Sequence, residues 1–184
     1  MNKKFLASLT IGLLIIGLVS NVSASLLDGN TVEYQYLYST INSNYSNADN
    51  GNKIVGPGVE VSNISDGTGT IDFSDTNIYV QFNISTNWNS ASFNGFRLTD
   101  IFSGISAFTS VTINPITNMA GFDSSRITFD DDHIWVNWQG LGFDSSTVVS
   151  LDLNGGQNSV PEPATMMLFG LGLLGLAGVS RKQK

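Results

Sequence analysis

The stretch that decides the fold class is Asn77-Ile78-Tyr79-Val80-Gln81-Phe82-Asn83-Ile84-Ser85. Aliphatic and aromatic side chains alternate in it with residues that tolerate water. Successive side chains of a β-strand point to opposite faces, so a period of two predicts a strand with one face in a core. We therefore expect Ile78, Val80, Phe82 and Ile84 to be buried, and Asn83 to lie on the opposite face.

The same alternation recurs along the chain. The inward faces of four further strands are expected to hold Val32, Tyr34, Tyr36 and Tyr38; Ile105, Ala107, Thr109, Val111 and Ile113; Ile134, Val136 and Trp138; and Val149, Leu151 and Leu153. Shorter strands are expected at 58–62, 69–73, 93–98 and 126–130, with turn-forming clusters between them. No amphipathic helix pattern occurs from Ser25 to Ser159. The pattern predicts an all-β domain, an antiparallel β-sandwich of jelly-roll type.

One five-residue segment occurs twice in this domain, at two expected turns. Gly121-Phe122-Asp123-Ser124-Ser125 recurs as Gly142-Phe143-Asp144-Ser145-Ser146, each copy before an expected strand. The Asp side chain can accept a hydrogen bond from the backbone just downstream, which favours a turn at the start of a strand.

Charge and composition narrow the function classes. Of the chain's 15 acidic residues, all but Glu162 lie between Ser25 and Ser159, against only three basic ones, Lys53, Arg97 and Arg126. Such a surface repels nucleic acid and anionic lipid, so no nucleic-acid partner is expected. The chain has no cysteine, which excludes disulfides and thiol chemistry.

Catalytic signatures are sparse. His133 is the only histidine, which limits zinc sites and Ser-His-Asp triads, and no Gly-rich loop between a strand and a helix suggests nucleotide binding. Paired carboxylates for glycoside cleavage stay open, because any two of the many Asp residues can meet in the fold. The inventory favours a protein without a catalytic site or a cofactor.

Asp130, Asp131 and Asp132 form the densest acidic spot. Three adjacent carboxylates repel one another, and an oxygen-seeking cation such as Ca²⁺ would relieve that repulsion. Adjacent side chains point in different directions, however, and the spacing is not that of an EF-hand loop. The alternative is a solvated hairpin turn before Ile134.

The three tryptophans have different expected places. Trp138 is expected in the core, and Trp135 on the opposite face of the same strand beside His133. Trp88 lies among polar neighbours between Asn87 and Asn89, so it is expected to be exposed. Exposed Trp beside Asn is typical of sugar binding, where the ring stacks on a pyranose and the amides bond its hydroxyls. Trp88 and Trp135 are thus candidate glycan contacts; the alternatives are packing of Trp88 on the sandwich edge and burial of Trp135 under a loop.

The N-terminus has the pattern of an export signal. Two lysines precede an apolar run from Phe5 to Val19, and Val22-Ser23-Ala24 supplies small residues before a cleavage point between Ala24 and Ser25. Residues 1–24 are therefore expected to be a signal peptide that the Sec export machinery recognises and that is removed. The alternative is an uncleaved N-terminal membrane helix.

The C-terminus has the pattern of a second targeting signal. Val160-Pro161-Glu162-Pro163-Ala164-Thr165 is followed by an apolar run, Met166 to Val179, and a basic end with Arg181 and Lys182. The prolines stiffen the first part into an extended strip. The run favours a short helix, about 164–180, that is marginal for a hydrocarbon core about 30 Å thick, with its basic end cytoplasmic. A permanent anchor that is never cut is the alternative.

This tail resembles the C-terminal signal of PEP-CTERM proteins, which are exported bacterial proteins. The resemblance implies processing by an exosortase-type membrane protease and an association with exopolysaccharide production. Together with the patterns above, it divides the chain into an expected signal peptide at 1–24, a β-sandwich at 25–159 and a sorting signal at 160–184. It implies a protein that is exported across the inner membrane, held there transiently, and then placed on the cell surface or in the biofilm matrix.

Two functions remain after these steps. The first is a non-enzymatic surface or matrix protein that has a structural role or binds carbohydrate weakly. The second is a secreted polysaccharide hydrolase or lyase.

Overall fold

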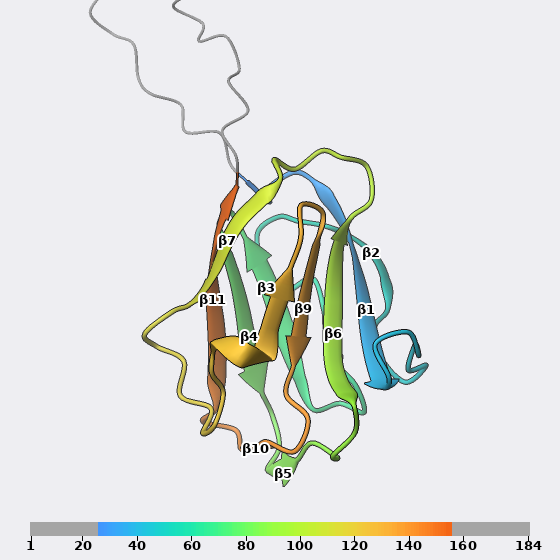
Figure 1. Ribbon diagram of the computed structural model, residues 1–184, viewed down its shortest axis with the longest axis vertical. Helices are drawn as coiled ribbons and strands as arrows, with labels where there is room; N and C mark the ends of the chain where they lie inside the picture. Colours follow the sequence, from blue (N-terminus) through green and yellow to red (C-terminus); the bar gives the residue numbers. More distant parts are fainter. Residues whose placement is uncertain (1–25, 156–184) are drawn as a thin grey trace, which may run out of the picture. The chain divides into compact units, whose positions relative to one another are not determined.

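The structure, a computed structural model, describes residues 26–155. They form two antiparallel sheets that enclose one core (Figure 1). The five-stranded sheet has the order β2 (Gly51–Ile54), β1 (Thr31–Ser39), β6 (Phe93–Asp100), β9 (His133–Asn137) and β8 (Ile127–Phe129). The four-stranded sheet has the order β3 (Gly69–Ser74), β4 (Asn77–Phe82), β11 (Val148–Gly155) and β7 (Phe108–Ile113). A separate pair, β5 (Thr86–Asn87) and β10 (Gly142–Phe143), lies at one end (Figure 1).

The core lies between the two sheets and is built from the alternating residues. Its inward side chains come from β1, β4, β9 and β11 as predicted, including Val32, Tyr34, Tyr36, Ile78, Val80, Phe82, Ile134, Val136, Val149, Leu151 and Leu153. β3 and β6 confirm the short strands expected at 69–73 and 93–98, and β8 confirms the one at 126–130. The all-β class and the antiparallel sheets are therefore confirmed.

The prediction that Ile84 lies in the core is wrong. The alternation put Ile84 on the inner face, but β4 ends at Phe82 and the side chain of Ile84 is 43% exposed. The chain turns out of the sheet after Asn83, whose backbone N–H still donates to the carbonyl of Thr68 at 2.8 Å, in register with the pairing of β3 and β4. This departure carries Ile84 to the end of the sandwich.

The strand expected at 58–62 is also wrong, since only an isolated bridge to Ile71 forms there. Side-chain hydrogen bonds of Glu60 replace the backbone pairing that a strand would make here. Its carboxylate accepts hydrogen bonds from the backbone N–H groups of Gly56 at 3.0 Å and Phe73 at 2.8 Å. Backbone donors satisfied by a side chain need no strand partner.

The strand expected from Ile105 starts later, at Phe108, and its predicted inward face is only half right. The register of β7 against β11 shifts next to Gly155, where Thr109 is the extra residue of a β-bulge. Phe108 is therefore buried and Thr109 exposed, against the prediction, whereas Ile113 packs on the core as predicted.

Within residues 26–155 there is no α-helix, only a single 3-10 turn at Ser124–Arg126. The strand orders leave the jelly-roll connectivity as a prediction. The two described ends lie at the end of the sandwich opposite to β5 and β10 (Figure 1). The predicted signal peptide with its cleavage point at Ala24 and Ser25, and the predicted helix at 164–180, lie outside the described residues.

Candidate functional site

A cavity of about 330 Å³ opens at the end of the sandwich where β5 lies. One wall comes from β1 and the two long loops beside it: Tyr36, Tyr38, Tyr45, Ser65, Asp66 and Thr68. The other wall comes from the segment between β4 and β6 and from the start of β6: Ile84, Thr86, Asn87, Trp88, Asn89 and Asn94. The lining is aromatic, hydroxyl and amide in character, with one carboxylate.

Trp88 lies in this wall, and its expected exposure is wrong. Its side chain is only 7% exposed, because the indole stacks on Trp138 with ring centroids 5.3 Å apart and packs against Phe143 at 4.8 Å. Its backbone N–H donates to the carbonyl of Leu141, the residue just before β10, at 2.9 Å. The polar neighbours Asn87 and Asn89 are exposed, so Trp88 is a core residue with exposed polar residues on both sides in the sequence.

Below Trp88 a chain of hydrogen bonds fixes the inner wall. Trp138 Nε1 donates to the hydroxyl of Tyr36 at 3.0 Å, and that hydroxyl donates to Asn94 Oδ1 at 2.7 Å. Asn94 Nδ2 donates in turn to the carbonyl of Asn89 at 3.0 Å. Burial raises the pKa of Tyr36 far above its ordinary value, so the phenol stays protonated and remains a donor.

The indole Nε1 of Trp88 is different. It is buried and has no hydrogen-bond partner among residues 26–155. A buried donor left without an acceptor costs about 1–3 kcal/mol, and most such groups in folded proteins are satisfied. Trp88, a lining residue of the cavity, therefore carries one donor whose hydrogen bond the described protein does not supply.

The outer part of the cavity is formed by two tyrosines and a carboxylate. Tyr38 and Tyr45 are half-buried and meet edge to face with centroids 5.9 Å apart. The hydroxyl of Tyr45 donates to Asp66 Oδ2 at 2.9 Å, and Asn47 Nδ2 donates to Asp66 Oδ1. The hydrogen bond to Asp66 raises the pKa of Tyr45.

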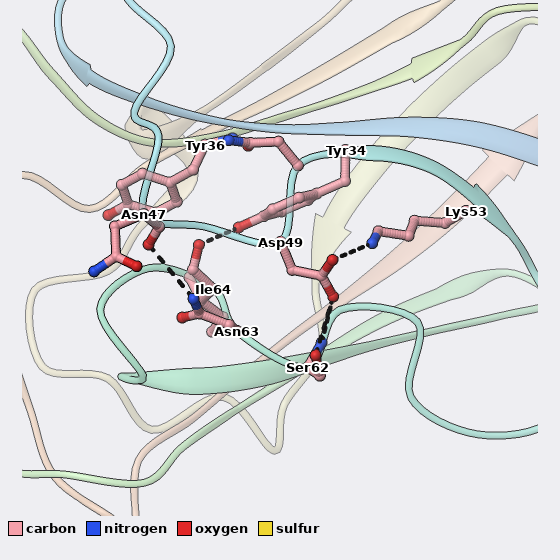
Figure 2. A network of polar contacts seen from close by, with 9 residues as sticks. Tyr34, Tyr36, Asn47, Asp49, Lys53, Ser62, Asn63 and Ile64 are labelled. Atoms are coloured by element: carbon pink, nitrogen blue, oxygen red, sulfur yellow. Dashed lines mark hydrogen bonds and ion pairs between the residues drawn. The ribbon is translucent and has the colours of Figure 1, made fainter.

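The loops that carry these groups are tied together around Asp49 (Figure 2). Its carboxylate pairs with Lys53 at 2.6 Å and accepts from Ser62 N at 3.0 Å. The hydroxyl of Tyr34, from β1, donates to the carbonyl of Ile64 at 2.9 Å (Figure 2). Partial burial opposes ionisation of Asp49, but the hydrogen bonds from Lys53 and Ser62 outweigh it and lower its pKa.

Trp135 lies away from the cavity, on the outer face of the five-stranded sheet, as predicted. It is half-buried and stacks on His133 with ring centroids 5.0 Å apart. Next to it Arg97 pairs with Glu33 at 3.2 Å. The structure does not bring Trp88 and Trp135 into one site.

The three adjacent aspartates form the turn between β8 and β9. Asp130 Oδ1 accepts from the backbone N–H of Asp132 at 3.0 Å and of His133 at 2.8 Å. The carbonyl of Asp131 accepts from Phe108 N at 3.0 Å. Among residues 26–155, no group of three or more His, Cys, Asp or Glu side chains is placed to hold a metal ion. The hairpin-turn interpretation accounts for these contacts.

Sequence reasoning did not identify Tyr38, Tyr45 and Asp66 as neighbours. Alternation assigned Tyr38 to the core, and the loops holding the other two had no motif. The only available signal was the polar segment from Ser85 to Ser90, which does enter the cavity wall.

The family model of the PEP-CTERM protein-sorting motif matches residues 159–182. The chain carries a PEP-CTERM sorting signal. The matched range includes the Pro161-Glu162-Pro163 strip, the apolar run and the basic residues Arg181 and Lys182, which confirms the resemblance seen in the sequence. The PEP-CTERM signal implies export and processing by an exosortase, a membrane protease, with passage through a membrane-anchored stage. Comparisons with curated proteins and with solved structures found no match. In residues 26–155, no helix combines the length and apolar character needed to span a membrane.

Proposed function

We propose that this is a surface or matrix protein whose β-sandwich binds a neutral glycan weakly and does not cleave it. Sec exports the chain, the PEP-CTERM tail holds it in the inner membrane, and an exosortase releases it from that anchor. The acidic sandwich then lies among the exopolysaccharide of the biofilm matrix, where many weak contacts along one polymer retain it.

The cavity at the end of the sandwich carries this proposal. Its lining combines tyrosine and tryptophan rings with amides and hydroxyls. Rings that face the apolar side of a sugar and amides that bond its hydroxyls are the usual components of carbohydrate sites. The only carboxylate in the lining, Asp66, already accepts hydrogen bonds from Tyr45 and Asn47. Glycoside cleavage generally needs two carboxylates about 5–10 Å apart, so this lining fits binding better than hydrolysis.

A secreted polysaccharide hydrolase or lyase is the second candidate, and one observation outside the cavity favours it. Burial raises the pKa of Asp72 on β3, and repulsion from Asp28 raises it further. A carboxyl with a raised pKa beside a second carboxylate is the pattern of a general acid. An enzyme of this kind would act at the four-stranded sheet, not at the cavity.

Gel electrophoresis through matrix polysaccharide distinguishes the two candidates. The full chain is purified in a polyoxyethylene detergent, because sugar-headed detergents would compete for the site. We expect retarded migration that soluble polysaccharide reverses, with single-site affinity on the order of millimolar and no new reducing ends. Release of reducing ends that is lost in Asp72→Asn would establish the hydrolase instead. Unretarded migration without cleavage would leave a purely structural role.

A further inference from the structure

We propose that the cavity at the end of the sandwich is a site for one uncharged pyranose unit, bound by a hydrogen bond from Trp88 Nε1. This inference rests on the proposed function and specifies its ligand class: a neutral sugar at a chain end or side branch, not a uronic acid and not a run of polymer.

The free donor supplies the first reason. Trp88 is 7% exposed, lines the cavity, and its Nε1 has no partner among residues 26–155, whereas the neighbouring indole of Trp138 donates to Tyr36 at 3.0 Å. Of two stacked indoles in the same cluster, one thus has its N–H satisfied by the protein and the other does not. A sugar hydroxyl or acetamido oxygen in the cavity is an acceptor that would complete the second.

The available ring faces supply the second reason. The indole of Trp88 is packed among Trp138, Phe143 and Phe82, with centroids 4.8–6.2 Å away, so these rings compete with a ligand for its faces. The half-buried rings of Tyr38 and Tyr45 provide apolar contact surface for the sugar instead. A lining that combines aromatic rings with a free N–H donor suits a pyranose, which is apolar on its faces and polar at its rim.

Charge supplies the third reason. Asp66 is the only charged residue that lines the cavity. The basic residues of the described chain are engaged elsewhere: Lys53 pairs with Asp49, Arg97 pairs with Glu33, and Arg126 donates to the carbonyl of Gln139. A carboxylate sugar would meet a like charge and no compensating cation, which costs affinity at short range.

Size supplies the fourth reason. The cavity volume of about 330 Å³ lies at the small end of the range for ligand sites, roughly 300–1,000 Å³. It also lies at the end of the sandwich and not along a sheet face, so a polymer would enter by its terminus or a branch.

Indole signals in ¹⁵N–¹H NMR spectra test the inference directly. The chain has three tryptophans, so Trp88→Phe and Trp135→Phe assign their indole signals by difference. The probes are the methyl glycosides of glucose, galactose, mannose and N-acetylglucosamine, with methyl glucuronoside as the charged match to methyl glucoside. We expect at least one neutral probe to shift the Trp88 signal saturably, and the glucuronoside to bind about fivefold or more weakly at pH 7.

Two variants make the result specific. Trp88→Phe keeps a ring but loses the donor, so affinity for the neutral probe should fall about two- to tenfold, as a single neutral hydrogen bond would predict. Asp66→Asn removes the charge, together with one of the two oxygens that accept from Tyr45 and Asn47, so it should bring glucuronoside binding close to that of the glucoside measured on the same variant. Trp135→Phe, on the outer sheet face, should change neither.

The outcomes separate this inference from the proposed function. Retention on matrix polysaccharide without any Trp88 shift, or with a shift at Trp135 instead, overturns the cavity site and leaves the glycan function standing. Equal binding of glucoside and glucuronoside by the unmodified chain overturns the charge selectivity. If the protein shows neither retention on the polysaccharide nor a shift of the Trp88 signal, both proposals are overturned.

Discussion

Phe82 shows at the residue scale what the alternation of the strand achieves. Its side chain is 1% exposed and packs against Trp88, Trp138 and Phe143. Phe82→Ala removes a buried ring and leaves a cavity that these rigid neighbours cannot fill, so we expect a loss of about 3–5 kcal/mol in the free energy of unfolding. Urea denaturation of the full chain in detergent, followed by tryptophan fluorescence, measures it.

Asn83, the next residue, is the matched control, because its side chain is exposed. Asn83→Ala should change the free energy of unfolding by no more than about 0.5 kcal/mol. Comparable losses in the two variants would show that the register assigned to β4 is incorrect.

The hydroxyl of Tyr36 gives a second residue-scale prediction. It accepts from Trp138 Nε1 and donates to Asn94 Oδ1, so Tyr36→Phe leaves two buried polar atoms without partners. We expect a destabilisation of about 2–4 kcal/mol by the same measurement. Tyr38→Phe alters a half-buried tyrosine two residues away and should cost less than about 0.5 kcal/mol. Equal costs would mean that the hydroxyl chain is not formed in solution.

At the scale of elements, the contacts of Asp49 with Lys53 and Ser62 make the stability of the fold depend on pH. The pKa of Asp49 in the folded protein lies below its ordinary value of 3.8, so the stabilisation is present above that value. It disappears as the pH falls through the lowered folded pKa. Because the side chain is one-third exposed, solvent screening limits the effect, and Asp49→Asn should cost about 0.5–1 kcal/mol at pH 7.

The measurement compares unfolding of the two proteins at pH 7 and at successively lower pH. The difference between wild type and Asp49→Asn should shrink to zero in acid. Asp131→Asn, in the exposed hairpin turn, should show no such difference at either end of the range. A gap that persists unchanged at low pH would assign the role of Asp49 to packing and not to charge.

At the scale of the whole molecule, the sorting signal and the sandwich occupy separate parts of the chain. Replacing Pro161 and Pro163 together by Ala relaxes the extended strip before the apolar run. In a host with the matching exosortase, we expect the variant to be exported but to keep Arg181 to Lys184, whereas the wild-type surface form lacks them. Intact mass of membrane and released fractions distinguishes the two forms.

The remaining two prolines of the chain, Pro57 and Pro115, give the control. Their joint replacement by Ala lies within the sandwich and should leave processing of the tail unchanged. If the wild-type surface form itself still carries Arg181, the tail is a permanent anchor and the processing step does not occur.

The sequence by itself determined whatever depends on local chemistry. Period-two alternation placed Val80 and Phe82 in the core because each strand side chain has only two faces to choose from. The repeated Gly-Phe-Asp-Ser-Ser turns formed as expected, with Asp123 Oδ1 accepting from Ser125 N and Asp144 Oδ1 from Ser146 N, since such bonds span two residues. The sorting signal was likewise readable, because its motif is one continuous stretch of sequence.

Only the tertiary structure decided the rest, because those features depend on partners distant in sequence. Trp88 is buried by Trp138 and Phe143, 50 or more positions away, so its polar neighbours were misleading. Ile84 is not in the core because β4 ends at Phe82, two residues before it, which the local alternation did not reveal. Asp66 and Tyr45 meet through a hydrogen bond that spans 21 positions. The cavity exists because sheet pairing brings these loops to one end of the sandwich, and no local pattern encodes that meeting.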